Sequence, residues 1–268
     1  MLEDKERTLL AAIGTLERVA VAFSGGVDSS LLLAVSVEVL GRERVVALTA
    51  DSPLLPREEL DTAREVAASL GVRLVELPFD ELQFAPVQTN APLRCYHCKR
   101  ARFEALQGYA RQLGGYVLVH GENADDALDD RPGSRAAAEL GVRAPLAEVG
   151  LTKAEIRELS RRRGLPTWNH PAASCLATRF STGTVLSREA LSRVEQAESA
   201  LRALLGEGQL RVRDHFPVAR IELPPAMIAA AAAEPLRERI VAALEPLGYR
   251  YVSLDLQGYR MGNMNAHV

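Results

Sequence analysis

The sequence lacks the features that define several broad classes of protein. Its three cysteines among 268 residues cannot form a closed disulfide framework, which excludes a small secreted domain held by disulfides. A formal net charge of −3 argues against a large nucleic-acid-binding surface. No apolar run is long enough to span a bilayer, and the charged N-terminus lacks the apolar core of a signal peptide. We therefore expect a cytoplasmic protein with no nucleic-acid partner and no membrane anchor.

Short β-branched segments alternate with helical ones along the first two-thirds of the chain. Hydrophobic residues make up 47% of the sequence and charged residues 25%, which is typical of a globular protein with a buried core. Strands that are separated by helices imply a parallel sheet covered on both faces, so the sequence predicts an α/β fold with a doubly wound parallel sheet. Strands are expected at 18–23, 44–51, 72–79 and 116–123, and the main helices at 27–40, 56–71, 95–113 and 151–164.

The pattern changes after about Thr184. A long amphipathic helix at 187–206 is followed by two short strands, an alanine-rich helix interrupted near Pro235, and a final strand at 249–258. We therefore expect an α/β domain over 1–184 and a smaller α+β domain over 185–268.

The stretch SGGVDSS follows the first predicted strand and leads into a predicted helix. Gly25 and Gly26 let backbone N–H groups approach an anion closely, and the start of the helix adds its dipole. The usual phosphate loop ends in Gly-Lys-Ser or Gly-Lys-Thr, but this stretch has no lysine and carries Asp28 instead. An aspartate beside phosphate makes sense where Mg²⁺ is also bound. The predicted phosphate-binding residues are Ser24, Gly25, Gly26, Val27, Asp28, Ser29 and Ser30.

This heptapeptide resembles the PP-loop of the ATP pyrophosphatases, which holds the departing pyrophosphate while a substrate is adenylated. The resemblance implies that the chain uses ATP and Mg²⁺, with Asp28 as a magnesium ligand. It does not name the acceptor of AMP. Asp51, at the end of the second predicted strand, is expected near the adenosine, and capping of a loop explains it equally well.

The three cysteines have a spacing that is typical of metal or redox chemistry. Cys95 and Cys98 form a C-x-x-C pair in RCYHCK, and Cys175 lies in SCLATR. A C-x-x-C pair on one helical turn can give two thiolates to one metal or cluster, and a third cysteine can join from another loop. A [4Fe–4S] cluster held by three thiolates has one open iron. Zinc with His97 as a further ligand, a redox pair and three unlinked cysteines are the alternatives.

Longer segments carry a closer resemblance. GENADD at 121–126, the stretch that ends in SCLATR, and RVRDHFPVARIEL at 211–223 resemble the LarE family over nearly the whole chain. LarE proteins are ATP-dependent sulfur transferases that help to make the nickel-pincer nucleotide cofactor. The resemblance implies that ATP adenylates a carboxylate of a pyridinium-3,5-dicarboxylate mononucleotide, and that sulfur then displaces AMP to give a thiocarboxylate. Relatives form homo-oligomers, so the second domain is expected to mediate assembly and to complete the site.

The resemblance leaves two sources for the sulfur. Some family members give up the sulfur of a cysteine that matches Cys175 and are left with dehydroalanine. Others have three cysteines, matching Cys95, Cys98 and Cys175, and look like holders of a [4Fe–4S] cluster whose open iron carries an extra sulfide. Because all three cysteines are present, the cluster is favoured here, with sulfide or a cysteine desulfurase as the supply.

Three arginines are candidates for binding phosphate groups. Arg211 and Arg213 alternate on a predicted strand and therefore share a face, where two guanidinium groups suit the phosphate of ATP or of the mononucleotide. A solvated strand face is the alternative. Arg179, four residues past Cys175, is expected either to steady an acyl-phosphate or to form a surface salt bridge.

Acidic residues in two further motifs give a less specific indication of function. Asp125 and Asp126 follow a strand end, where they are expected to bind Mg²⁺, to orient substrate, or simply to cap the next helix. Glu222 is a candidate for a metal site at a subunit contact.

Three other functions are weighed against sulfur transfer to a small molecule. A tRNA-thiolating enzyme predicts a basic face and salt-sensitive RNA binding, which the net charge of −3 does not favour. An ammonia-dependent ligase of the NAD synthetase type would not need the cysteines. A non-enzymatic scaffold would bind nucleotide without releasing pyrophosphate.

Overall fold

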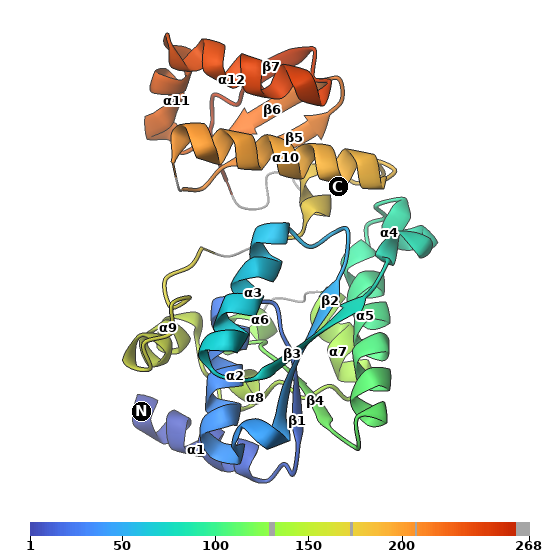
Figure 1. The fold of residues 1–268 in the computed structure, drawn as a ribbon, viewed down its shortest axis with the longest axis vertical. Helices are drawn as coiled ribbons and strands as arrows, with labels where there is room; N and C mark the ends of the chain where they lie inside the picture. Colours follow the sequence, from blue (N-terminus) through green and yellow to red (C-terminus); the bar gives the residue numbers. More distant parts are fainter. Residues whose placement is uncertain (129–131, 172–173, 207, 261–268) are drawn as a thin grey trace. The chain divides into compact units, whose positions relative to one another are not determined.

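The computed structural model describes residues 1–128, 132–171, 174–206 and 208–260 (Figure 1). Contacts within the chain divide it into two units. The first comprises Met1–Phe84 and Leu93–Ala173, and the second comprises Ala85–Pro92 and Ser174–Val268. Each unit contains its own sheet. The expected domain boundary after residue 184 stays a prediction.

The first unit is built on a parallel sheet. Its strands are β1 (Val19–Ala22), β2 (Val45–Asp51), β3 (Arg73–Pro78) and β4 (Val117–His120). Their order is β3-β2-β1-β4 and every pairing is parallel, which confirms the predicted α/β fold. The chain moves from β1 outward to β3 and then returns to the other side of β1, so the strand order reverses there. In sheets of this kind, ligands bind beyond the carboxyl ends of the strands at the reversal.

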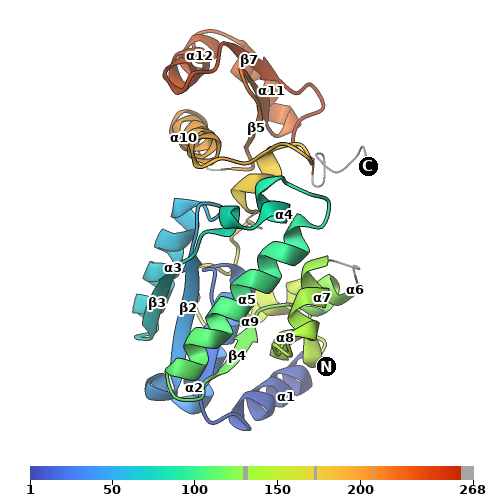
Figure 2. The same ribbon diagram turned by 90° about the vertical axis from the view of Figure 1, so that its right-hand side faces the viewer.

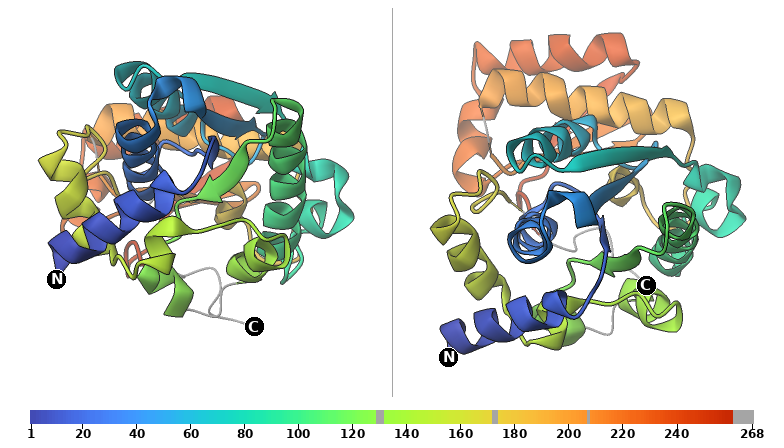
Figure 3. Two further views of the ribbon diagram at one scale, coloured as in Figure 1. Left: turned by 90° about the horizontal axis from the view of Figure 1, so that it is seen from below. Right: turned by 60° about the horizontal axis from the view of Figure 1, so that its bottom comes forward.

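Helices cover both faces of this sheet (Figure 2, Figure 3). They are α1 (Leu2–Gly14), α2 (Val27–Leu40), α3 (Arg57–Ser69), α5 (Arg94–Gln112), α6 (Ala124–Leu128), α7 (Pro132–Glu139), α8 (Pro145–Glu148) and α9 (Lys153–Arg162). Val19 and Val21 of β1 belong to one apolar core with α1, α2, α3 and α9, whereas Ala20 belongs to a second core with α5 and α7. Successive side chains of a strand point to opposite faces, so β1 contributes to both cores.

The second unit combines helices with a smaller sheet. Its elements are α4 (Ala85–Gln88), α10 (Arg188–Leu205), β5 (Arg211–His215), β6 (Val218–Glu222), α11 (Pro225–Ala232), α12 (Leu236–Leu244) and β7 (Tyr251–Leu254). The strand order is β5-β6-β7, with β5 antiparallel and β7 parallel to β6. The alanine-rich segment is interrupted between α11 and α12, as Pro235 predicts. Across the described part of both units, no helix has the length and apolar character that crossing a membrane requires.

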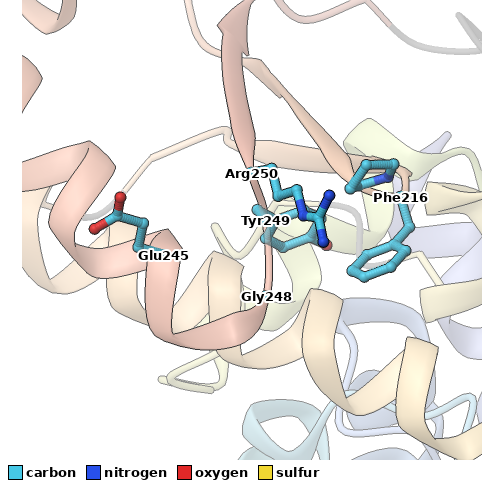
Figure 4. Close-up of a pocket in the computed structure, with 6 residues that line it drawn as sticks. Phe216, Glu245, Gly248, Tyr249 and Arg250 are labelled. Atoms are coloured by element: carbon cyan, nitrogen blue, oxygen red, sulfur yellow. The ribbon is translucent and has the colours of Figure 1, made fainter.

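A pocket in the second unit lies apart from the predicted site residues. Phe216, Pro217, Glu245, Gly248, Tyr249 and Arg250 line it (Figure 4). The guanidinium carbon of Arg193 lies 4.1 Å from the centroid of the Phe216 ring, and Arg193 also pairs with the buried Asp214 at 3.0 Å. None of the lining residues is among the predicted catalytic or binding residues. The candidate active site is therefore built from the predicted residues and not from this pocket.

Two glycines allow backbone segments of the first unit to approach very closely. Gly25, between β1 and α2, has a φ of +76°, and a Cβ there would lie 2.8 Å from the backbone nitrogen of Ala63 in α3. Gly121 directly follows β4, and its Cβ would lie 2.8 Å from the backbone nitrogen of Ser29 in α2. Both positions therefore require glycine, and they bring α3 and the end of β4 onto the loop that follows β1.

Replacement of Gly25 by alanine is expected to destabilise the protein because the new methyl group meets backbone that cannot move aside. Gly41→Ala is the matched control, since Gly41 has a φ of +78° but no atom within 4 Å of its Cβ position. Both variants carry the cost of a positive φ, about 1–3 kcal/mol. Gly25→Ala should lose roughly 1–3 kcal/mol more from the steric clash. Urea unfolding followed by circular dichroism measures both losses, and equal losses would contradict the steric argument.

Candidate active site

The loop of residues 24–30 joins β1 to α2 at the point where the strand order reverses. Its hydroxyl groups are directed mainly at the loop itself. Ser30 Oγ donates to the carbonyl oxygen of Gly25 at 3.3 Å, and Ser29 Oγ donates to that of Gly26 at 3.1 Å. Ser24 Oγ accepts the N–H of Gly26 at 3.4 Å. The serines thus shape the loop, while the N–H groups at the start of α2 are the donors that it offers to an anion.

Asp28, in the first turn of α2, pairs with a lysine that is 125 residues away in the sequence. Lys153 Nζ donates to both carboxylate oxygens of Asp28, at 2.7 and 2.8 Å, and Asn123 Nδ2 donates to one of them at 3.3 Å. The side chains of Asp28 and Lys153 are 19% and 33% exposed, so solvent reaches the pair. The donor type of Asp28 fits the predicted magnesium ligand. In this structure, however, a lysine holds both of its oxygens.

The two aspartates of GENADD belong to a turn that is organised by Asn123. Asn123 Oδ1 accepts the N–H groups of Asp125 and Asp126 at 2.9 and 3.1 Å, and Asn123 Nδ2 donates to Asp126 Oδ2 at 2.7 Å. Asp125 Oδ2 accepts the backbone N–H of Lys153 at 2.8 Å. Asp125 therefore satisfies a donor at the start of α9, a helix 28 residues further along the chain. Roles for the two aspartates in binding Mg²⁺ or substrate stay predictions.

Asp51, the last residue of β2, forms an ion pair with Arg57 at the start of α3. The distance from Arg57 Nη1 to Asp51 Oδ1 is 2.5 Å, and Arg57 Nη2 donates to the carbonyl oxygen of Ser52 at 2.7 Å. These contacts fix the connection between β2 and α3. The expected proximity of Asp51 to adenosine stays a prediction.

Cys95 and Cys98 lie one turn apart near the start of α5, and neither thiol is in a disulfide. Cys95 is exposed and Cys98 is half-buried. Arg94 Nη2 lies 3.4 Å from Cys95 Sγ, and Arg102 Nη2 lies 3.8 Å from Cys98 Sγ. Metals bind cysteine as the thiolate, and the Arg94 guanidinium would balance part of the charge of a metal-bound thiolate. Arg102 already forms an ion pair with the buried Glu81, which offsets its own charge.

Cys175 lies in the second unit, directly before the short helical turn Leu176–Arg179, and a buried arginine holds this segment. Arg179 Nη1 donates to the carbonyl oxygens of Ser174 and Cys175 at 2.8 and 3.1 Å. The other side of the guanidinium binds both carboxylate oxygens of Glu198 in α10, at 2.9 and 2.8 Å. Each side chain is only 2% exposed. For Arg179, the predicted alternative to phosphate binding was a salt bridge at the surface. A salt bridge does form, but both of its side chains are buried.

The environment keeps this pair charged. Burial alone would raise the pKa of Glu198, but the hydrogen bonds and charge of Arg179 hold the pKa of that carboxyl below its usual value. Glu198 Oε1 also accepts the N–H of Val212 in β5 at 3.0 Å. The pair therefore ties the backbone beside Cys175 to both α10 and β5.

A second arginine–glutamate pair binds the same segment. Arg213 Nη2 donates to Glu222 Oε2 at 2.6 Å, and Arg213 Nη1 donates to the carbonyl oxygen of Thr178 at 2.8 Å. The Glu222 side chain is 0% exposed, so its carboxylate serves this pair within the unit. A metal site at Glu222 would have to compete with Arg213 for Oε2 and with Arg220 for Oε1.

Arg211 differs from Arg213 although both lie on β5. Its Nη1 donates to the carbonyl oxygen of Leu210 at 2.7 Å, and burial followed by the nearby charge of Arg179 lowers its pKa. A cation in this position is stabilised by an incoming anion. The predicted phosphate contacts of Arg211 and Arg213 stay predictions.

Residues 6–174 match the model of the NAD synthase family. The pyridinium-3,5-bisthiocarboxylic acid mononucleotide synthase of Lactiplantibacillus plantarum is 39% identical over 98% of this chain and 95% of that protein. The chain belongs to the LarE family. An uncharacterised protein of Synechocystis is 42% identical over 99% of this chain and 98% of its own length. By contrast, the NH₃-dependent NAD synthetase of Methanococcoides burtonii is 27% identical over only 56% of this chain and 59% of its own.

The three cysteines of this LarE-family chain are distributed over its two units. Cys95 and Cys98 belong to the first unit and Cys175 to the second. Within the described residues, no group of three or more His, Cys, Asp or Glu side chains is placed so that it could hold a metal ion.

Two residues that the structure brings to these sites, Lys153 and Glu198, are not among the predicted site residues. Lys153 follows Thr152, which forms a capping box with Glu155 at the start of α9. Glu198 had a usable signal, because Leu191, Val194, Glu198 and Leu201 form one buried stripe of α10. A carboxylate in an apolar stripe requires a buried partner.

Replacement of Glu198 by glutamine is expected to destabilise the LarE-type second unit by about 3 kcal/mol, because Arg179 keeps its charge without a buried counter-charge. Glu189→Gln is the control, since Glu189 is an exposed residue of the same helix. It should change the free energy of unfolding by less than about 1 kcal/mol, since its carboxylate lies in the first turn of α10 and interacts only with the exposed start of the helix. Urea unfolding of both variants measures the difference, and similar small losses would show that the pair contributes little.

Proposed function

We propose that this chain is an ATP-dependent sulfur transferase that converts carboxylates of a pyridinium-3,5-dicarboxylate mononucleotide into thiocarboxylates for the nickel-pincer nucleotide cofactor. The observation that carries the proposal is the 39% identity to a pyridinium-3,5-bisthiocarboxylic acid mononucleotide synthase over 98% of the chain. The match to the NAD synthase family ends at residue 174, whereas this similarity includes the second unit with Cys175, Arg179 and Arg211.

The first step activates the carboxylate, whose oxygen would otherwise be a poor leaving group. A carboxylate oxygen attacks the α-phosphorus of ATP, and the bond from that phosphorus to pyrophosphate breaks. Pyrophosphate leaves with the electron pair, and an acyl-adenylate remains. The N–H groups at the start of α2 receive the charge of the departing pyrophosphate. Asp28 offers oxygen ligands for Mg²⁺, which neutralises phosphate charge when it is bound.

The second step replaces AMP with sulfur. A sulfur nucleophile attacks the acyl carbon, and AMP leaves with its oxygen. We propose that this sulfur comes from a group that the three cysteines hold, namely Cys95, Cys98 and Cys175. Their donor type suits a [4Fe–4S] cluster, and the arginine beside Cys95 suits the negative charge of a thiolate ligand. Such a cluster would supply a sulfide bound at its open iron, replenished from free sulfide or a cysteine desulfurase.

The alternative source is the sulfur of Cys175 itself. After that sulfur has joined the acyl carbon, the bond between Cβ and Sγ would break. The electron pair would stay with the sulfur of the thiocarboxylate, the α-proton of residue 175 would go to a base, and dehydroalanine would remain. This route uses only Cys175 and allows one turnover.

The second unit would bind the phosphate of the mononucleotide and mediate assembly of a homo-oligomer. Arg211 is the residue assigned to that phosphate, since its guanidinium donates to the backbone carbonyl of Leu210 and an anion would offset the nearby charge of Arg179. Arg179 and Arg213 are assigned to holding the Cys175 segment, because their guanidinium groups bind carbonyl oxygens of residues 174, 175 and 178.

Iron and acid-labile sulfide in protein purified without oxygen test the sulfur source. The cluster requires about four of each per chain in the wild type. Both should be lost in Cys95→Ser, because two thiols do not hold the cluster. Iron-free wild-type protein that makes thiocarboxylate and whose mass then falls by the elements of hydrogen sulfide would instead establish Cys175 as a sacrificial donor.

The same preparation, supplied with MgATP, sulfide and the pyridinium dicarboxylate mononucleotide, tests the function as a whole. Thiocarboxylate, AMP and pyrophosphate are expected in equal amounts and are measured by mass spectrometry and chromatography. ATP that is bound but never converted to AMP and pyrophosphate would contradict the proposed function, whatever the iron content.

A further inference from the structure

Trp168, a few residues after α9, presents an open aromatic ring at the surface of the first unit. It is the only exposed phenylalanine, tyrosine or tryptophan among the described residues of that unit, and the only tryptophan of the chain. Its exposed fraction is 39%, and within the described residues no aromatic ring or cation stacks on the indole. One exposed apolar residue is common in itself. What distinguishes Trp168 is how its backbone is held.

Arg157 of α9 fixes the segment 168–170. Its Nη1 donates to the carbonyl oxygen of Trp168 at 3.0 Å and to Asn169 Oδ1 at 3.3 Å, and its Nη2 donates to the carbonyl oxygen of His170 at 2.8 Å. The N–H of Trp168 donates to the carbonyl oxygen of the buried Leu165 at 3.2 Å. The indole is therefore carried by an ordered backbone, and a ligand that stacks on it loses less free energy to ordering of the protein.

The segment 168–170 lies beside the start of α9, which adjoins the phosphate-binding loop. Lys153, the first residue of α9, places Nζ 2.7 Å from Asp28 of that loop. Arg157 follows Lys153 by four residues, and side chains at this spacing share a face of the helix. Helical side chains also point back toward the N-terminus of their helix, so the guanidinium that binds residues 168–170 is directed toward the start of α9. Trp168 is thus placed near the expected phosphates of ATP.

An open indole in this place suits a planar ring that is poor in electrons. Tryptophan has the aromatic face that attracts cations most strongly, and a pyridinium ring is both positively charged and flat enough to stack on it. Arg157 supports the same ligand in a second way. Within the described residues its guanidinium binds only neutral oxygens, so no carboxylate there offsets its charge, which attracts the carboxylates carried by the ring.

We propose that Trp168 is the surface on which the pyridinium ring of the mononucleotide stacks, and that Arg157 is the positioning residue that holds this surface in place. The proposal rests on the proposed function for the identity of the ligand. It makes Trp168 a specificity-determining residue, since a neutral ring of the same shape would lack the attraction between the indole and a cation.

Fluorescence of the single tryptophan tests the stacking directly. The pyridinium-3,5-dicarboxylate mononucleotide should quench the emission of Trp168, alone or with α,β-methylene-ATP, because a stacked electron-poor ring accepts an electron from the excited indole. An analogue with carbon in place of the ring nitrogen should bind about 3- to 30-fold more weakly and quench less. MgATP alone should leave the emission unchanged. Quenching by MgATP as strong as that by the mononucleotide would overturn the proposal, because adenine would then be the ring on Trp168.

Trp168→Leu should weaken mononucleotide binding, measured by calorimetry, about 3- to 30-fold and leave MgATP affinity unchanged. Trp168→Phe should lose less, since it keeps a weaker aromatic face. Tyr116→Leu is the matched control. It also removes an aromatic ring from the first unit, but Tyr116 directly precedes β4 and lies at the edge of the sheet opposite to the site. Equal losses of mononucleotide affinity in Trp168→Leu and Tyr116→Leu would contradict a direct contact.

The role of Arg157 has a readout of its own. Arg157→Gln should lower the fluorescence anisotropy of Trp168 in the ligand-free protein and weaken mononucleotide binding, because the segment 168–170 is released. Arg161→Gln is the control, since it removes a guanidinium of the same helix that binds Glu158, at 2.9 and 3.0 Å. Anisotropy that is the same in Arg157→Gln and in the wild type would refute the positioning role.

Failure of this proposal is distinguishable from failure of the proposed function. A protein whose Trp168 emission is quenched by the mononucleotide, but which forms no thiocarboxylate, would refute the function and still support the stacking. A protein that forms thiocarboxylate, but whose Trp168→Leu variant keeps the wild-type KM for the mononucleotide, would refute the stacking alone. If Trp168→Leu does not fold, as judged by circular dichroism, Trp168→Phe is measured in its place.

Discussion

The exclusion of side chains at Gly25 and Gly121 is the constraint on which the ATP site depends. A Cβ at either position would lie 2.8 Å from a backbone nitrogen of a neighbouring helix. With hydrogen there instead, the end of β4 packs directly on the first turn of α2. The turn after β4 then brings Asn123 to Asp28 and Asp125 to the start of α9. Close backbone packing therefore decides which charged groups meet at the loop.

The two units use ion pairs in physically different ways. The pair of Asp28 and Lys153 is part-exposed, so water and Mg²⁺ can replace either partner at modest cost. The pair of Arg179 and Glu198 is almost fully buried, and separating it would leave an uncompensated charge inside the protein. Such a pair does not exchange partners but fixes the carbonyl groups that it binds. The first unit is thus suited to binding and releasing a charged nucleotide, and the second to holding the Cys175 segment still.

Local patterns predicted the framework of both units but not the partners of their charged residues. The Gly-Gly turn, the alternation of strands and helices and the break near Pro235 each depend on neighbours in the sequence, and the structure confirms them. The pairing of Asp28 with Lys153 joins residues 125 apart and leaves no local signature. The burial of Arg179 likewise has no local signature in the sequence, because it results from packing against α10.

The two sulfur sources differ in what they imply for the stability of the folded chain. Cys95 and Cys98 lie one turn apart on α5 of the first unit, and Cys175 belongs to the second unit. A metal group that binds thiols of the folded protein more tightly than those of the unfolded chain stabilises the folded state by mass action. A sacrificial Cys175 supplies its own sulfur and adds no stabilisation of this kind. A cluster would therefore link the supply of sulfur to the stability of the chain, whereas sacrifice of Cys175 would separate the two.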